Sequence, residues 1–257
     1  KIIFYKIFNL TKPSFFGIKK AKYVYLMGKE SYLNRKNHKL VGKKTGLIWG
    51  HHRTYDDFLR GGTIKLKTKK KKALYIDSGA PYGPDLIELG LDDLKPNSYY
   101  RSVRLFLEKL NKKFGYKIEI SCHPKIDIKN LKKHFRNFPI KVHKTISQVM
   151  SSDLIVLHDS TARNFAIMHK KPVIFITNND ELKSAYNHYG ETSKIANLVN
   201  KQPLNIDICS NADIKNNLIL NKKTYQDYFK NFLKFKGEKK LQPEIIIKKL
   251  KNDRIWI

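Results

Sequence analysis

The loop over residues 158–164 holds the side chains best suited to binding a phosphate. Ser160 and Thr161 stand where an apolar run ends and an amphipathic pattern begins. At the start of a helix, unpaired backbone N–H groups and the helix dipole favour an anion, and hydroxyls add donors. Arg163 can add a charge-assisted hydrogen bond. The alternative is that Asp159 or Ser160 is only an N-cap, which the same residue types satisfy.

A second candidate is the dipeptide His123-Pro124, which follows the predicted strand at 117–121 and Cys122. Pro124 holds the preceding residue extended. An imidazole in this place can donate to a phosphate or act as a general acid on a departing one. A single histidine is also a common structural or surface residue, so its spacing alone does not decide between the two.

Two carboxylates, Asp77 and Asp85, flank a third loop rich in glycine and proline. Asp77 ends an apolar run and can act as a base on an acceptor hydroxyl, or it can anchor the loop. Asp85 is the other candidate base.

Other sequence patterns argue against several kinds of site. His51 and His52 with Asp56 and Asp57 resemble a metal cluster, but adjacent histidines usually point to different sides, so we expect no metal. The chain also lacks a Walker-type lysine loop, GxGxxG and GxSxG. These absences disfavour P-loop ATPases, dinucleotide enzymes and serine hydrolases.

Short apolar runs alternate with amphipathic stretches from residue 73 onward. Strands are predicted at 73–77, 117–121, 140–142, 153–157 and 172–176, and helices at 97–114, 128–136, 146–150, 161–169, 180–187, 223–234 and 243–251. This pattern predicts a doubly wound α/β domain with a parallel sheet. The three polar loops then meet at the carboxyl edge of the sheet, where ligands bind in such folds. We expect a partial N-terminal α/β region at residues 1–72. Its lysine run at 65–72 is expected to be a solvated linker or an edge of the domain. The sheet domain, together with the C-terminal helices, is expected at residues 73–257.

The net charge of +30 has three possible explanations: lysine-rich composition, attraction to an anionic membrane surface, or nucleic-acid binding. Only eight of the 52 basic residues are arginine. A surface built to read phosphates would use more arginine, because its planar fork binds phosphate in a bidentate manner. Nucleic acid is therefore the least favoured partner.

The two cysteines, Cys122 and Cys209, form no CxxC pair and fit a reduced, cytoplasmic protein. No apolar run approaches the ~20 residues that span a bilayer, and the first five residues do not predict a signal peptide. The sequence begins at Lys1, which leaves open a longer protein.

Together these motifs resemble a group of bacterial capsule and surface-polysaccharide biosynthesis proteins. The resemblance covers residues 73–185 and rests on the loop 76–85, Tyr99-Tyr100, the run 120–124, Lys144-Thr145 and the stretch 159–175. These proteins in turn resemble the Rossmann-like C-terminal domains of GT-B glycosyltransferases that use CMP-activated sugars, the sialyltransferase and polysialyltransferase type. In that family an HP motif and a Ser/Thr motif hold the nucleotide phosphate, and His123, Pro124, Ser160 and Thr161 match them.

The resemblance implies transfer of a sugar from a nucleotide donor, CMP-linked in this family, to a hydroxyl of a growing glycan or lipid-linked acceptor. No cofactor beyond the nucleotide-sugar co-substrate is expected, and the enzyme would work in the cytoplasm or on the inner face of the membrane. Polyol-phosphate transfer of the teichoic-acid type and a non-catalytic nucleotide- or polyanion-binding module are the alternatives. The chain departs from the family in lacking an acidic-acidic-glycine motif, so Asp77 or Asp85 would have to supply the base.

Overall fold

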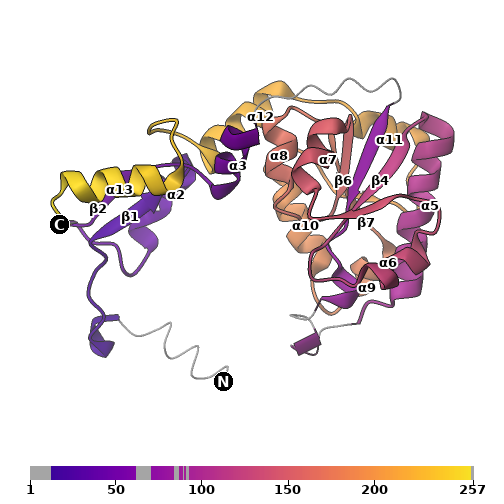
Figure 1. Cartoon of the computed structure of the whole chain (residues 1–257). Helices are drawn as coiled ribbons and strands as arrows, with labels where there is room; N and C mark the ends of the chain where they lie inside the picture. The colour runs from indigo at the N-terminus through magenta and orange to yellow at the C-terminus, as the bar shows by residue number, and fades with distance from the viewer. Residues whose placement is uncertain (1–12, 62–70, 84–86, 89, 91–92, 256–257) are drawn as a thin grey trace. The chain divides into compact units, whose positions relative to one another are not determined.

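A computed structural model describes residues 13–61, 71–83, 87–88, 90 and 93–255 (Figure 1). The chain divides into two compact units. Unit 1 combines Lys1–Gly62 with Gln226–Ile257, and unit 2 is Thr63–Tyr225. Each unit is described by itself below.

Unit 2 is built on a six-stranded sheet, parallel throughout, with the strand order β5-β4-β3-β6-β7-β8. The strands are β3 (Lys72–Ile76), β4 (Lys117–Cys122), β5 (Ile140–Val142), β6 (Leu154–Leu157), β7 (Val173–Thr177) and β8 (Leu204–Asn205). The chain winds outward from β3 to β5, returns to β6 beside β3, and winds outward again to β8. This order is the one found in Rossmann folds, and the predicted doubly wound sheet is confirmed.

Strands β3, β6 and β7 read as unbroken apolar runs because both of their faces are covered. Alternate side chains, such as Tyr75 and Val156, pack with α5 and α6 into the main core. The intervening residues, such as Leu74 and Phe175, are fully buried as well. Figure 1 shows α5, α6 and α11 on one side of the sheet and α7, α8 and α10 on the other.

The helices of unit 2 are α5 (Pro96–Phe114), α6 (Ile128–His134), α7 (Thr145–Ser151), α8 (Arg163–Met168), α9 (Asn179–Lys183), α10 (His188–Asn197), α11 (Asn211–Asn217) and α12 (Lys222–Tyr228), which continues past the unit boundary. Helix α5 ends at Phe114, as expected, and its C-cap Gly115 is left-handed with φ 72°. It begins one residue earlier than expected, with Lys95 as its N-cap, because Pro96 occupies the first helical position, where proline is favoured.

Unit 1 contains a two-stranded parallel sheet, β1 (Tyr23–Leu26) and β2 (Gly46–Trp49). Around it lie the 3-10 turns Pro13–Phe16 and Asn34–Asn37, helices α2 (Lys29–Leu33), α3 (Arg53–Gly61) and α13 (Gln242–Asn252), and a π-helical segment, Phe229–Leu233.

The C-terminal helices differ from the expected division at residue 72. Residues 226–257 belong with the N-terminal residues and not with the large sheet. The N–H of His52 donates to the carbonyl of Leu233, and that of Phe235 donates to Met27. A Cβ on Gly28 would come within 2.0 Å of the Asn231 carbonyl oxygen, so the two segments are in close backbone contact. The lysine run at 65–70 lies outside the described residues, and Lys72 begins β3.

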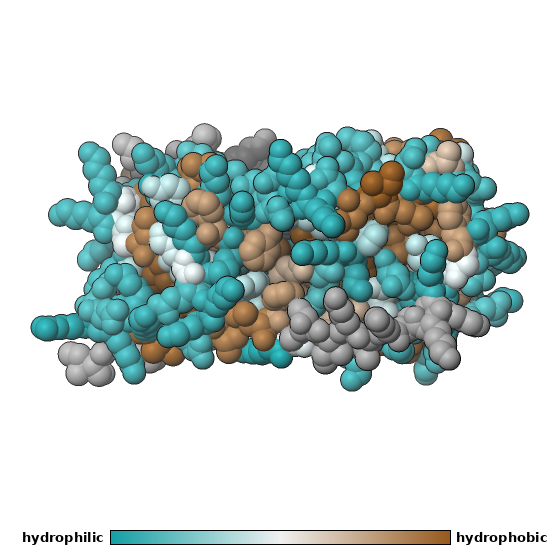
Figure 2. Space-filling model, turned by 90° about the horizontal axis from the view of Figure 1, so that it is seen from above, coloured by the Kyte–Doolittle hydropathy of each residue, from teal (hydrophilic) through white to brown (hydrophobic). Residues whose placement is uncertain are grey.

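The surface seen in Figure 2 is mainly hydrophilic, with apolar side chains in separate patches. None of the helices that the structure describes has the length and apolar character needed to cross a bilayer.

Candidate functional site

The carboxyl ends of β3 and β6 lie side by side at the point where the strand order reverses. Ile76 pairs with Ser121 of β4 on one side and with Leu157 of β6 on the other. One residue further along, Asp77 therefore lies between Cys122 and His158. In open α/β sheets this reversal point is where ligands bind. The topology brings the three predicted loops to one edge of the sheet.

Asp77 is buried at the centre of this edge, with 2% of its surface exposed. Its carboxylate lies 3.3 Å from the hydroxyl of Tyr75 and 3.5 Å from that of Tyr100, both placed to donate. Burial raises the pKa of Asp77 to about 6, and the Gly79 N–H, His158 and the two tyrosines limit the rise. Of the two roles considered for Asp77, this enclosure favours anchoring the loop over direct contact with an acceptor.

His158, which follows β6, occupies an equally buried position with 2% exposure. Its Nε2 lies 2.9 Å from the Tyr99 hydroxyl, and its Nδ1 lies 3.0 Å from Oε1 of Glu181. Burial lowers the pKa of His158, but the carboxylates of Glu181, Asp159 and Asp77 together raise it, Glu181 most, and the net shift is upward. Glu181 is held in turn by a capping box with Asn178 at the start of α9.

The loops after β3 and β4 touch at Gly79. This residue has φ 70° and begins the short 3-10 turn Ala80–Tyr82. A Cβ there would lie 2.6 Å from Cγ1 of Ile126 and 3.7 Å from Cβ of His123. His123 is half-buried and Pro124 is exposed, so the predicted HP pair lies at the accessible side of the edge.

Ser160 and Thr161 follow the buried His158 and come before α8. Ser160 is half-buried and its hydroxyl accepts the N–H of Ala162 at 3.2 Å, while Thr161 is exposed. Helix α8 begins at Arg163, two residues later than expected. The Arg163 guanidinium donates to the carbonyls of Asp159, at 3.4 Å, and Ser160, at 3.1 Å, and so braces the loop.

Two further buried polar groups lie at the end of β7. Oγ1 of Thr177 and Nδ2 of Asn178 are buried and have no hydrogen-bond partner among the described residues. Buried polar atoms are almost always paired by protein, water or ligand. Because β7 pairs with β6, these two groups lie at the same edge of the sheet.

Several residues of this edge escaped the sequence analysis, and one predicted residue is not placed. Asp85 lies outside the described residues, so its role stays a prediction. His158, Glu181 and Tyr99 were not predicted as site residues. The Asn178-x-x-Glu181 capping pattern was a usable signal for α9, but nothing in the sequence linked it to His158.

Cys122 is free, and burial raises the pKa of its thiol to about 11, so it is not a ready nucleophile.

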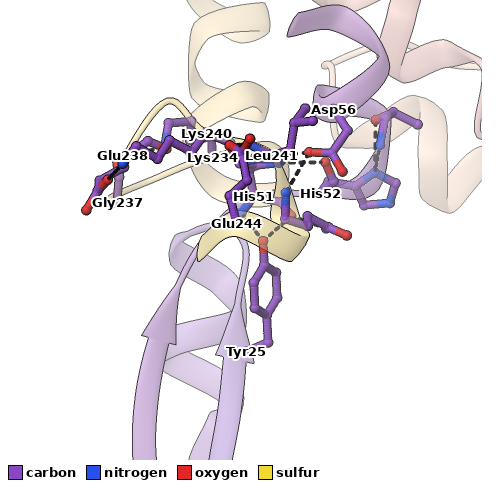
Figure 3. Close-up of polar contacts among 12 residues, drawn as sticks. Tyr25, His51, His52, Asp56, Lys234, Gly237, Glu238, Lys240, Leu241 and Glu244 are labelled. Carbon is purple, nitrogen blue, oxygen red and sulfur yellow. Dashed lines mark hydrogen bonds and ion pairs between the residues drawn. The ribbon is translucent and has the colours of Figure 1, made fainter. Parts of the chain in front are cut away.

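Within unit 1, His51 and Asp56 contact the backbone at residues 240–242, where α13 begins (Figure 3). Nδ1 of His51 lies 3.1 Å from the His52 carbonyl, and Nε2 lies 2.8 Å from the Lys240 carbonyl. Asp56 accepts the N–H of Gln242 at 2.9 Å. No group of three potential metal ligands occurs among the residues that the structure describes.

The strand order and the residues at the carboxyl edge of the sheet define a doubly wound α/β protein, with buried polar groups at the point where the strand order reverses. No protein-family model matches the sequence, and no curated protein matches it. Among solved structures, a variant of the wall teichoic acid polymerase TagF is 14% identical, with a TM-score of 0.49 over 91% of this chain and 60% of that one.

A second TagF structure, soaked with CDPG, is 15% identical, with a TM-score of 0.46 over 92% of this chain and 58% of that one. MurG of Acinetobacter baumannii is 9% identical, with a TM-score of 0.38 over 85% and 62%. The chain thus spans about three-fifths of the length of each of these structures.

Proposed function

We propose that this chain belongs to a glycosyltransferase of surface-polysaccharide synthesis, and that unit 2 binds the phosphate of a nucleotide-activated donor at the carboxyl edge of its sheet. The observation that carries the proposal is the strand order, which puts the loops of Asp77, His123 and Ser160 around one reversal point. The motif resemblance supports the same reading of His123-Pro124 and Ser160-Thr161.

Each residue of the edge has a defined role in this proposal. His123, on the accessible side, stabilises or protonates the leaving phosphate, where negative charge develops during transfer. The hydroxyls of Ser160 and Thr161 bind that phosphate, and Arg163 braces their loop. Pro124 holds the backbone extended beside His123. Asp77 anchors the loop after β3, which leaves Asp85 as the candidate base for the acceptor hydroxyl.

A CMP-linked sugar is the donor that the motif resemblance implies, and a glycan or a lipid-linked glycan is the acceptor. A CDP-linked polyol presents its phosphates to the same kinds of side chain, and its use would make the enzyme a polyol-phosphate transferase. In either case the lysine-rich surface would draw the enzyme to the anionic cytoplasmic face of the membrane.

Calorimetric titration of the whole chain with CMP, CDP, UDP and GDP tests this function. The variants His123→Ala and Ser160→Ala are compared with His38→Ala, which removes an exposed imidazole from unit 1. One lost hydrogen bond to a charged group weakens binding by roughly tenfold or more. We expect that loss in the two site variants and none in His38→Ala.

The nucleotide preference then separates the alternatives. Selective CMP binding supports a CMP-sugar transferase, and stronger CDP binding at the same residues supports the polyol-phosphate alternative. If no nucleotide binds, or if binding survives both site substitutions unchanged, the proposed phosphate site is wrong.

A further inference from the structure

A basic pocket lies away from the edge site, between α5 and the residues that follow α6. Its volume is about 410 Å³, which falls within the range of small-molecule sites. Arg101 and Arg104 line it from α5, and Lys133 and Arg136 line it from the end of α6 and the turn beyond. Glu108 is the only carboxylate among the lining residues.

The arginines of this pocket stand out in a chain that otherwise uses lysine. Only eight arginines occur in 257 residues, and three of them line this one pocket. Lysine enrichment by composition does not explain such clustering. A guanidinium offers a planar fork that matches phosphate and carboxylate, whereas an ammonium acts as a point charge.

The charges in the pocket are only partly neutralised. Nη1 of Arg104 lies 2.9 Å from Oε1 of Glu108. Within the described part of the chain, the guanidinium groups of Arg101 and Arg136 make no hydrogen bond or ion pair. The side-chain amides of Asn97 and Asn137 also line the pocket. Forked cations beside neutral amides suit a ligand that carries both an acidic group and hydroxyls.

An aromatic layer connects this pocket to the edge of the sheet. His134 lines the pocket, stacks on Tyr100 with ring centroids 4.7 Å apart, and has its Nε2 2.9 Å from the Tyr82 hydroxyl. The Tyr100 hydroxyl in turn donates to Asp77. The pocket and the edge site therefore lie near opposite ends of one packed set of rings.

We propose that the pocket between α5 and the turn after α6 binds an acidic segment of a glycan through the guanidinium groups of Arg101, Arg104 and Arg136. The proposed function is used only to identify the ligand as a glycan, namely the acceptor chain of the transfer reaction. The acidic group is a carboxylate or a phosphodiester, because the arginine fork matches both.

Calorimetric titration of the whole chain tests the pocket with defined probes. The carboxylate probe is tetragalacturonate, and its methyl ester is the uncharged match with the same hydroxyls. The phosphodiester probe is a short poly(glycerol phosphate), and inorganic phosphate is tested alone. The variant Arg101→Gln/Arg136→Gln removes two forks, and Lys112→Gln/Lys113→Gln removes two exposed charges from the last turn of the same helix.

We expect one of the acidic oligomers to bind, the methyl ester of tetragalacturonate not to bind, and the arginine variant to lose roughly tenfold or more in affinity. The lysine variant should bind like the wild type. Arg101→Lys/Arg136→Lys keeps the charge but not the fork, and it should bind more weakly than the wild type. CMP and CDP binding should be unaffected by the arginine variant.

Equal loss in the arginine and lysine variants would overturn the proposal, because it would show general surface attraction. Equal binding of the methyl ester, or full competition by inorganic phosphate at similar affinity, would overturn the assignment to an acidic glycan. If the oligomers bind through the arginines but no nucleotide binds, the pocket stands and the proposed function fails. If nucleotide binds and no oligomer does, only the pocket proposal fails.

Discussion

His158 and Glu181 form a buried ion pair at the carboxyl edge of the sheet, with 3.0 Å between His158 Nδ1 and Glu181 Oε1. The two side chains are 2% and 3% exposed. Burying two charges is costly, and the pair persists because other bonds hold each partner. Tyr99 contacts the second nitrogen of His158, and the N–H of Asn178 donates to the second oxygen of Glu181. The pair links the ends of β6 and β7, next to the proposed phosphate loop.

Replacing Glu181 with glutamine should lower the pKa of His158, because the carboxylate that opposes the effect of burial is removed. The wild-type pair contributes stability fully below the ordinary histidine pKa of 6.5, and that contribution is lost as pH rises through the higher folded pKa. Glu181→Gln should lose this contribution and about 1–3 kcal/mol of unfolding free energy at pH 6. Histidine NMR titration and urea denaturation measure both.

The matched control is Glu191→Gln, which breaks the exposed pair with Lys194 on α10. Exposed pairs of this kind contribute about 0–1 kcal/mol, so little change is expected. An unchanged His158 titration in Glu181→Gln would contradict the assigned ion pair.

Asp77→Asn should flatten the dependence of stability on pH between about 4 and 6. The folded pKa of Asp77 is raised from 3.8 to about 6, chiefly by burial. Over that window the folded state binds more protons than the unfolded state, so the wild type loses stability as pH rises. The loss from this one group is about 3 kcal/mol. Urea denaturation at several pH values gives the slope of the unfolding free energy against pH for the wild type and for Asp77→Asn. Identical slopes in these two proteins would show that Asp77 is not the group responsible.

Gly79→Ala should destabilise unit 2 more than Gly115→Ala does. Both glycines are left-handed, with φ 70° and 72°. A side chain at either position costs roughly 1–2 kcal/mol in backbone strain. At Gly79 the new Cβ also meets Ile126 at 2.6 Å, whereas nothing lies within 4 Å at Gly115. Overpacking adds about 1–3 kcal/mol.

Thermal or urea unfolding of the two glycine variants gives the comparison. Because Gly79 also lies against His123, we expect Gly79→Ala to weaken nucleotide binding and Gly115→Ala to leave it unchanged. Equal destabilisation in the two variants would mean that the loops after β3 and β4 are not in the close contact described.

His51→Ala should destabilise unit 1, because the fully buried His51 ring connects the end of β2 to the segment at residue 240. Loss of the buried ring and its hydrogen bonds costs about 2–4 kcal/mol. Hydrogen exchange should accelerate in β1, β2 and the start of α13 more than in β3 to β7. His38→Ala, which removes an exposed ring, is the control. If His51→Ala does not speed hydrogen exchange in β1, β2 and α13 more than in β3 to β7, a structural role for His51 is contradicted.

Local patterns were enough to predict the central elements of unit 2. The apolar runs that become β3, β6 and β7 are buried on both faces, so their composition carries a strong signal. The end of α5 was predicted correctly at residue 114, where the left-handed Gly115 ends the helix. The start of α5 was predicted one residue too late, because the fixed φ of Pro96 already suits the first helical turn.

The amino-acid sequence by itself determined the sheet domain, its polar loops and the edge at which those loops emerge, because these depend on periodicity and on residues close together in the chain. Only the tertiary structure decided which side chains pair across strands. The contact of His158 with Glu181, the enclosure of Asp77 by Tyr75 and Tyr100, and the grouping of residues 226–257 with the N-terminal unit all join distant positions. Such contacts arise from packing in three dimensions, which leaves no regular spacing in the chain.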